Sequence, residues 1–269
     1  MSKTVCITGA SSGIGKSVGE YLAERGYTVF GSSRNPEKYP NSKFPLLELD
    51  VRDENSVQQF VQSVLEKSNR IDVLINNAGV GITGAAEEIP EAEIKAVFET
   101  NFYGPIRMMK AVLPQMHLQK GGLIINITSI AGYMGLPYRS YYSASKAALE
   151  MVTEAMRMET KPFNIQLTNV APGDFATNIA AGRYHHPLRE NSPYFRDYKT
   201  TLDLMNAHVD SGNDPVKMAE AIHRIIQNPS PAVRYRVGSF LQKISVFLKN
   251  TLPGKVYEKM LMNHYKIGK

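Results

Sequence analysis

Short runs rich in β-branched residues alternate with longer amphipathic stretches along the first 170 residues of the chain. This alternation predicts βαβ units around a parallel sheet. The stretch 53–67 repeats its apolar side chains at helical spacing, which predicts that one helix face packs on the sheet. We therefore expect an α/β fold with about seven strands in one doubly wound parallel sheet and helices on both faces. The expected strands are 4–8, 27–32, 46–50, 71–76, 123–128, 165–170 and 233–237, with further helices at 13–24 and 214–227.

One stretch breaks this rhythm. Residues 178–213 are polar and aromatic, contain Pro187 and Pro193, and show no clean period. A long irregular insertion of this kind is usually a binding loop or a lid, so we expect it to cover the substrate. Because no low-complexity linker or internal repeat divides the chain, residues 1–269 are predicted to form a single domain.

The composition is typical of a globular protein. Apolar residues make up 43% of the 269 residues and charged residues 21%, which excludes a disordered or collagenous chain. Cys6 is the single cysteine, so an intrachain disulfide is excluded. The apolar run at 4–8 is too short for a secretory signal, and no apolar stretch approaches the roughly 18 residues that cross a bilayer. We expect a cytoplasmic protein.

Positive charge is concentrated near the C-terminus. Residues 234–269 contain eight Lys or Arg and one acid, Glu258, for a net charge of +7, whereas the rest of the chain carries −1. The body of the protein is therefore not basic, and nucleic-acid binding is not expected.

The segment 238–269 is also amphipathic. Phe240, Leu241, Ile244 and Phe247 align at helical spacing, with lysines outside the stripe. Two interpretations remain open: a helix packed on its own domain or across a homo-oligomer, which we expect to be a dimer or tetramer, and a basic surface that touches a membrane or covers a lipophilic substrate. The second makes peripheral contact with a membrane a hypothesis for this chain.

A glycine-rich turn follows the first expected strand and leads into a helix. Glycines at this point permit a tight turn and a close approach of the backbone to a ligand. The helix N-terminus offers free N–H groups and a positive dipole end to a pyrophosphate. The spacing is G-x3-G-x-G and not the G-x-G-x-x-G fingerprint. The turn predicts a dinucleotide site with contacts from Gly9, Ser11, Ser12, Gly13, Ile14 and Gly15.

The end of the second expected strand bears on the choice of dinucleotide. An acid there would bind the ribose 2′-hydroxyl of NAD(H), but the chain reads Ser32-Ser33-Arg34-Asn35. Arg34, with Ser33 beside it, could instead pair with a 2′-phosphate. We therefore predict NADP(H) as the cofactor, with NAD(H) as the less favoured alternative.

Tyr142 and Lys146 lie four residues apart in a stretch that is predicted to be helical through Lys161. Side chains at this spacing share a helix face, so the ammonium can lie near the phenol. An unperturbed tyrosine has a pKa of about 10, and a nearby cation lowers it toward the range that a general acid or base needs. Ser129 stands at the carboxyl end of the strand expected at 123–128, where it could hydrogen-bond a carbonyl oxygen as charge develops on it.

With these motifs, the sequence resembles the classical short-chain dehydrogenase/reductase family over nearly its whole length, and its ending is most similar to hydroxysteroid and retinol dehydrogenases. The resemblance implies a Rossmann-type fold and a catalytic tetrad of Ser129, Tyr142, Lys146 and Asn101. It also implies that the cofactor is contacted by Asp50, Val51, Asn77, Ala78, Gly79, Tyr142, Lys146, Pro172, Gly173, Phe175 and Thr177.

The function that this resemblance implies is hydride transfer between NADP(H) and a carbonyl or secondary alcohol of a small, apolar substrate. Tyr142 would exchange the proton, Ser129 would polarise the oxygen, Lys146 would lower the pKa of the tyrosine, and Asn101 would complete a proton relay. Two alternatives stay open: a non-catalytic NADP(H)-binding sensor and an NAD-dependent alcohol dehydrogenase of the same family. A metal site is not expected at His185-His186, because adjacent histidines point in different directions on a regular element and no cysteine lies near them.

Overall fold

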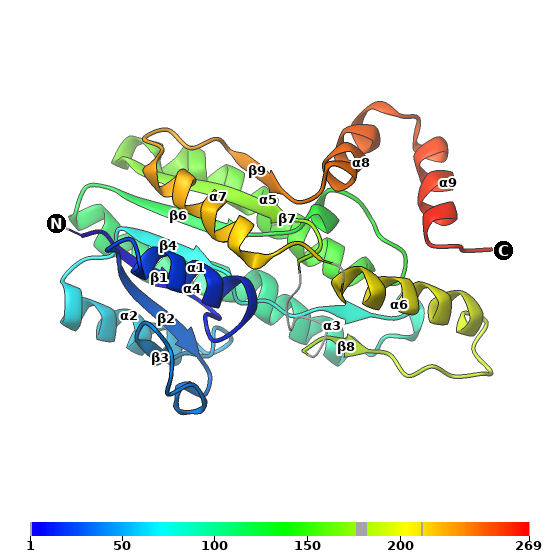
Figure 1. Ribbon diagram of the computed structural model, residues 1–269, viewed down its shortest axis with the longest axis horizontal. Helices are drawn as coiled ribbons and strands as arrows, with labels where there is room; N and C mark the ends of the chain where they lie inside the picture. Colours follow the sequence, from blue (N-terminus) through cyan, green and yellow to red (C-terminus); the bar gives the residue numbers. More distant parts are fainter. Residues whose placement is uncertain (1, 176–181, 211, 269) are drawn as a thin grey trace.

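A seven-stranded parallel sheet forms the centre of the computed structural model, which describes residues 2–175, 182–210 and 212–268 (Figure 1). The strand order is β3-β2-β1-β4-β6-β7-β9, which reverses direction beside β1 and is the doubly wound, Rossmann-type arrangement. The seven strands and the fold class predicted from the sequence are therefore confirmed. They are β1 (Thr4–Ile7), β2 (Thr28–Ser33), β3 (Leu46–Glu48), β4 (Val73–Asn76), β6 (Gly122–Ile127), β7 (Ile165–Pro172) and β9 (Arg234–Val237).

The central strands are apolar on both faces because helices cover both. In β1, Val5 and Ile7 point into one apolar core and Cys6 into the other, and all three side chains are fully buried. Continuous apolar runs of this kind are expected of parallel strands, whose crossover helices exclude water from each side. The register places Cys6 beside Phe30 of β2 and Leu74 of β4.

Two layers of helices enclose the sheet. The first apolar core packs α1 (Gly13–Ala23) and α7 (Pro215–Gln227) against one face, and the second packs α2 (Glu54–Ser68), α4 (Gly104–Leu118) and α5 (Ser140–Thr160) against the other. The helical spacing predicted for 53–67 is confirmed, since Val57, Phe60, Val61 and Val64 are the buried side chains of α2. Asp53 caps that helix by accepting a hydrogen bond from the Asn55 N–H.

The prediction of an irregular insertion at 178–213 is wrong for most of the part that the structure describes. Residues Phe195–Asp210 form helix α6. Its inward face is built from Tyr198, Thr201 and Met205, all buried at helical spacing. The period escapes a search for apolar residues because a threonine and a tyrosine occupy two of these positions, where each makes a hydrogen bond inside the fold.

A small parallel ribbon lies outside the main sheet. It pairs β5 (Ile82–Thr83) with β8 (Tyr184–His185), and each strand is too short for its alternation to be recognised in the sequence. The ribbon ties the segment that leads into α6 to the loop after β4. His185 contributes to this link, with its Nδ1 atom 3.0 Å from the Thr83 hydroxyl.

The chain ends in two helices, α8 (Phe240–Thr251) and α9 (Gly254–His264), which lie at the edge of the molecule away from the N-terminus (Figure 1). Val246 and Tyr257 are buried where these helices pack on the turn Ile130–Tyr133, so the segment rests on its own chain, as the first of the two interpretations predicts. In the described residues, no helix is long and apolar enough to cross a membrane.

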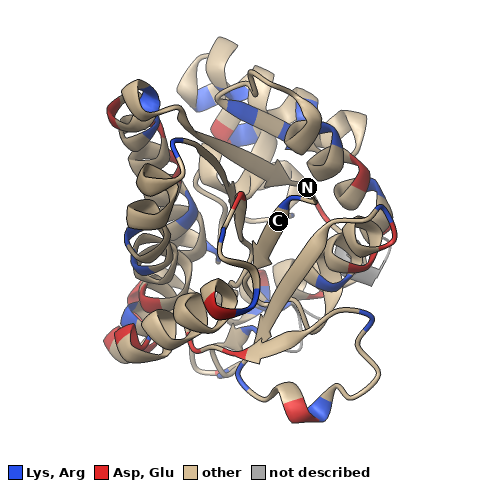
Figure 2. Cartoon of the chain, turned by 90° about the vertical axis from the view of Figure 1, so that its left-hand side faces the viewer, with Lys and Arg blue, Asp and Glu red and all other residues tan. Residues whose placement is uncertain are grey.

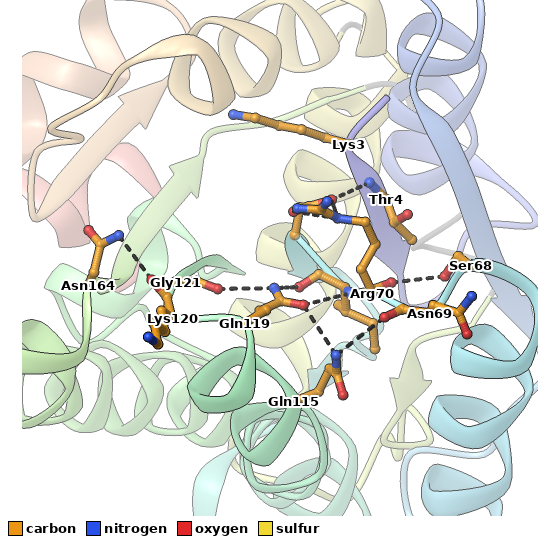
Figure 3. Close-up of polar contacts among 12 residues, drawn as sticks. Lys3, Thr4, Ser68, Asn69, Arg70, Gln115, Gln119, Lys120, Gly121 and Asn164 are labelled. Carbon is orange, nitrogen blue, oxygen red and sulfur yellow. Dashed lines mark hydrogen bonds and ion pairs between the residues drawn. The ribbon is translucent and has the colours of Figure 1, made fainter. Parts of the chain in front are cut away.

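The amino ends of the strands are closed by a polar network, drawn in Figure 3. Arg70 binds Asp72 through two nitrogens, and Asp72 also accepts a hydrogen bond from the Thr4 N–H at 2.7 Å. The Gln119 amide bridges to the carbonyl groups of Ile71 and Gly121. A cavity of about 400 Å³ lies here, but its polar groups are bonded to one another, which is the arrangement of a structural cap.

Candidate active site

The candidate active site is a cavity of about 490 Å³ at the carboxyl ends of the strands. This is where open α/β sheets bind ligands, beside the point at which the strand order reverses. The cavity collects most of the residues that the sequence predicts to contact a cofactor: Gly9, Ser11, Ser12, Gly13, Ile14, Ser33, Arg34, Asp50, Val51, Asn77, Ala78, Gly79, Tyr142, Lys146 and Pro172.

The glycine-rich turn is held against the loop after β4. Gly9 has φ +64°, and a Cβ there would lie 2.9 Å from the Ala78 Cα, so the position requires glycine. The Thr8 hydroxyl accepts hydrogen bonds from the backbone N–H groups of Asn77 and Ala78, both at 2.9 Å. The Asn77 side chain donates back to the carbonyl groups of Thr8 and Gly9. Gly15 does not line the cavity, because it packs beneath this turn against Gly9 and Asn77.

The first turn of α1 fits an anionic ligand. Helix α1 starts at Gly13, and the side chain of its N-cap residue Ser12 makes no capping hydrogen bond. Backbone N–H groups at a helix N-terminus, together with the positive end of the helix dipole, form a phosphate site. The residues present therefore fit the pyrophosphate of a dinucleotide, with glycines where the backbone must come close.

The far end of the cavity carries two arginines. Arg34 is exposed at the end of β2, with Ser33 buried beside it. Arg52 was not predicted from the sequence, although it lies two residues after Asp50 and also lines the cavity. Its guanidinium is 2.6 Å from the Asp50 carboxylate, and this hydrogen bond is the main cause that lowers the pKa of Asp50. None of the described ion pairs involves Arg34, although its charge also helps to lower the pKa of Asp50.

Asn101 is aimed inward by an irregular helical turn. Residues Glu99–Tyr103 form a π-helical turn between α3 (Glu91–Phe98) and α4, and such bulges redirect side chains from the helical course. Asn101 is fully buried, accepts a hydrogen bond from the Val80 N–H at 2.8 Å, and donates to the Val80 carbonyl at 2.9 Å. It also donates to the Ser145 hydroxyl. These contacts fix the side chain below the loop that follows β4.

Lys146 lies beside Asn101. A Cβ placed on Gly79 would lie 3.3 Å both from Lys146 Nζ and from Asn101 Oδ1, so the two side chains flank one small space. Lys146 is 4% exposed, and its ammonium donates to the Ile127 carbonyl at 2.9 Å. Burial lowers the pKa of Lys146 to about 8, while the negative charge of Glu150 opposes that shift.

Ser129 lies near enough to Tyr142 for its hydroxyl to lower the pKa of the phenol, so the structure brings these two predicted residues together. Lys146 Nζ lies 6.0 Å from the centre of the tyrosine ring. Lys146 is not among the main causes that act on the pKa of Tyr142 in this structure, so the expectation that the lysine lowers that pKa stays a prediction. Burial raises the pKa of Tyr142, and the contributions that lower it come from Ser129 and from the charges of Arg139 and Arg183. The ammonium is instead bonded to the Ile127 carbonyl.

Besides Gly15, two predicted cofactor contacts are not among the described residues that line the cavity. Gly173 lies under Gln242 of α8, and Phe175 is 4% exposed in the core with α1 and α7. Both were predicted from the resemblance to the family and not from a physical pattern in the sequence. Thr177 lies outside the described residues.

Three further charged residues near the site, two arginines and a glutamate, were not predicted from the sequence. Arg139 and Arg183 are the cations whose charges act on Tyr142, and Glu150 stands one helical turn after Lys146. The position of Glu150 could have been recognised, because i,i+4 spacing places it on the face of Lys146. Arg183 lies in the stretch without a clean period, where the sequence offers no such signal.

Comparison with known proteins identifies the family. A model of the short chain dehydrogenase family matches residues 3–187. The chain belongs to the short-chain dehydrogenase family. This short-chain dehydrogenase is 40% identical to a 3-ketodihydrosphingosine reductase of Bacteroides thetaiotaomicron over 98% of both chains. It is also 32% identical to human retinol dehydrogenase 8, with 86% of this chain and 80% of the relative covered.

A solved short-chain dehydrogenase from Streptomyces avermitilis has the same fold, with a TM-score of 0.83 and 33% identity over 100% of this chain and 99% of the other. The family resemblance and the similarity to retinol dehydrogenases predicted from the sequence are confirmed. This short-chain dehydrogenase is accordingly an oxidoreductase that acts on CH–OH groups, with a fold that binds NAD(P)(H). Its family acts on small-molecule substrates.

Proposed function

We propose that this short-chain dehydrogenase uses NADPH to reduce the ketone of an apolar, lipid-like substrate. The observation that carries the proposal is the grouping of four side chains at the cavity: Tyr142 and Lys146 line it, Ser129 lies beside Tyr142, and Asn101 and Lys146 flank one space above Gly79. The 3-ketodihydrosphingosine reductase relative makes a long-chain ketone of that kind the first substrate to test.

The four side chains divide the work of proton transfer. A bound reduced nicotinamide supplies the hydride. Tyr142 gives its hydroxyl proton to the carbonyl oxygen, and Ser129, which lies beside that phenol, orients and polarises the same oxygen. Lys146 and Asn101 pass a replacement proton toward the phenol through the space that they share. The reverse sequence oxidises a secondary alcohol.

The preference for NADP(H) rests on Arg34. The end of β2 carries no acid to bind a ribose 2′-hydroxyl, and Arg34 is exposed beside the cavity while Arg52 is occupied by Asp50. A guanidinium binds a phosphate through two parallel hydrogen bonds, which gives both charge and geometry. NAD(H) use by the same site is the alternative.

The apolar substrate class is supported by the walls beside the reactive groups. Val80 and Tyr184 line the cavity with Tyr142, and all three are partly buried side chains packed against an apolar cluster. Pockets for small molecules use such surface for affinity. We assign the segment 178–213 to covering this space, within a single domain that spans residues 1–269. A cytoplasmic homo-oligomer, either a dimer or a tetramer, is part of the same proposal.

The test follows oxidation of NADPH and NADH in the presence of 3-ketodihydrosphingosine and of a panel of simpler ketones and aldehydes. We expect turnover that prefers NADPH and is lost in Tyr142→Phe, while that variant still binds NADPH in a fluorescence titration. NADPH binding without turnover of any panel member would overturn the proposal in favour of a non-catalytic sensor. Equal efficiency with both nucleotides would leave the reductase standing and remove the NADPH preference.

A further inference from the structure

The two C-terminal helices leave apolar side chains in solvent. We call residues Phe240–His264 the C-terminal hairpin. On α8, Phe240, Leu241 and Phe247 are 75%, 76% and 60% exposed, and on α9 the exposed apolar side chains include Val256 and Met260. Phe240 and Phe247 on α8 are seven residues apart, and Val256 and Met260 on α9 are four apart, so the two members of each pair share a helix face. Neighbouring positions on the same helices are already used, since Val246 and Tyr257 are buried against the turn Ile130–Tyr133.

Basic side chains accompany these apolar ones. Lys243 and Lys249 lie on α8 and Lys255 and Lys259 on α9, all exposed, and Glu258 is the one acid of the segment 234–269. That segment carries +7 against −1 for the rest of the chain. On the body, by contrast, basic and acidic positions are interspersed along the helices (Figure 2).

Charge decides which partner fits this face. A second copy of the chain joined through the same surface would bring two positively charged segments together, which opposes association. A bilayer with anionic lipid attracts the lysines and accepts the phenylalanines at the level of its headgroups. We infer that the C-terminal hairpin docks the protein on the surface of a bilayer that contains anionic lipid.

The hairpin is joined directly to the candidate active site. Gln242 of α8 donates a hydrogen bond to the Asp174 carboxylate at 2.7 Å, just beyond β7. Tyr257 of α9 is bonded to the Met134 sulfur, and α8 packs on the turn that follows Ser129. Docking therefore fixes the Ser129 side of the site near the bilayer. If the proposed function holds, a lipid ketone can pass from the bilayer to the site without crossing water.

The test is flotation of the full-length protein with vesicles of phosphatidylcholine, with and without phosphatidylglycerol. We expect the protein to float with the anionic vesicles at low salt and to be released at about 1 M salt, where the screening length falls to roughly 3 Å. Phe240→Glu with Phe247→Glu should lower the partition coefficient roughly a hundredfold or more, because two aromatic side chains no longer enter the interface.

The matched control is Leu118→Glu, which alters a side chain that is 79% exposed at the end of α4. This variant should float like the unaltered protein. Folding of every variant is checked by its NADPH-dependent turnover of a water-soluble ketone, which the hairpin substitutions should not change. That assay also separates the two proposals, since flotation does not depend on turnover.

Three results would overturn the inference. The first is absence of binding to anionic vesicles at low salt. The second is binding that the double hairpin substitution leaves intact. The third is a combination of two observations: the unaltered protein is a dimer that does not bind vesicles, and the double variant sediments as a monomer. That result would assign the face to a second copy of the chain.

Discussion

Replacing Lys146 with methionine should stabilise the folded protein at neutral pH while abolishing turnover. Burial lowers the pKa of Lys146 from 10.5 to about 8. Each pKa unit corresponds to about 1.4 kcal/mol, so holding this ammonium in the fold costs on the order of 3 kcal/mol. Methionine has a similar length and no charge, but it leaves the Ile127 carbonyl without the donor that lies 2.9 Å away. That loss costs about 1 to 2 kcal/mol, and the net gain is about 1 to 2 kcal/mol.

The gain should depend on pH in a defined direction. Between the folded pKa of about 8 and the unfolded value of 10.5, the unfolded chain binds more protons than the folded one at this position. The stability of the unaltered protein therefore rises with pH across that window, whereas the contribution at residue 146 is constant in the variant. The advantage of Lys146→Met is full below about pH 8 and is lost as the pH approaches 10.5.

Urea unfolding of the cofactor-free protein at about pH 7 and about pH 10 measures both free energies. Lys161→Met is the matched control, because Lys161 is exposed and its substitution should change little at either pH. The reasoning is refuted if Lys146→Met is less stable than the unaltered protein at neutral pH. It is also refuted if the difference between them does not shrink as the pH rises.

Three further substitutions test separate parts of the site. Gly9→Ala should lower the melting temperature more than Gly26→Ala does in the same calorimetric scan, since both have positive φ but only Gly9 has a backbone atom within 3 Å of the added Cβ. Asn101→Ala should cost about 2 to 4 kcal/mol in urea unfolding, because it removes a fully buried side chain that bonds both the N–H and the carbonyl of the partly buried Val80; a loss below 1 kcal/mol would contradict this. Arg34→Ala should lower the ratio of kcat/KM for NADPH to that for NADH by roughly tenfold or more, with NADH kinetics as the internal control; an unchanged ratio would exclude Arg34 as the phosphate contact.

The sheet could be predicted from the sequence because the residues within each strand are enough to identify it. β-Branched runs bounded by turn residues place β1 and β4 within two residues of their observed limits, since burial on both faces leaves little choice of side chain. Helix α6 could not be predicted in the same way, because its inward positions include Thr201 and Tyr198, whose burial depends on partners elsewhere in the chain.

The candidate site, like the fold, could be predicted from the sequence only in part. The glycine-rich turn and the pair Tyr142 and Lys146 are visible as motifs, and the structure brings them to one cavity. The pKa shifts of the site residues cannot be predicted from motifs in this way. The sequence shows that an ammonium can reach the phenol, but the direction of the Tyr142 pKa depends on how much water the fold removes and on the charge of Arg183, forty-one residues later.

The carboxylate of Glu150 helps to keep Lys146 protonated although the lysine is buried. Its carboxylate is buried, which raises its pKa, but it accepts hydrogen bonds from the Thr128 hydroxyl at 2.5 Å and from the Asn169 amide at 3.2 Å, and Arg234 lies 3.1 Å away. These partners hold a negative charge one helical turn from Lys146, where it opposes the effect of burial on the lysine. Thr128 also precedes Ser129 in the chain. One buried carboxylate therefore supports the charge of the lysine and fixes the strand end that carries the serine, so substitutions of Glu150 should disturb both groups together.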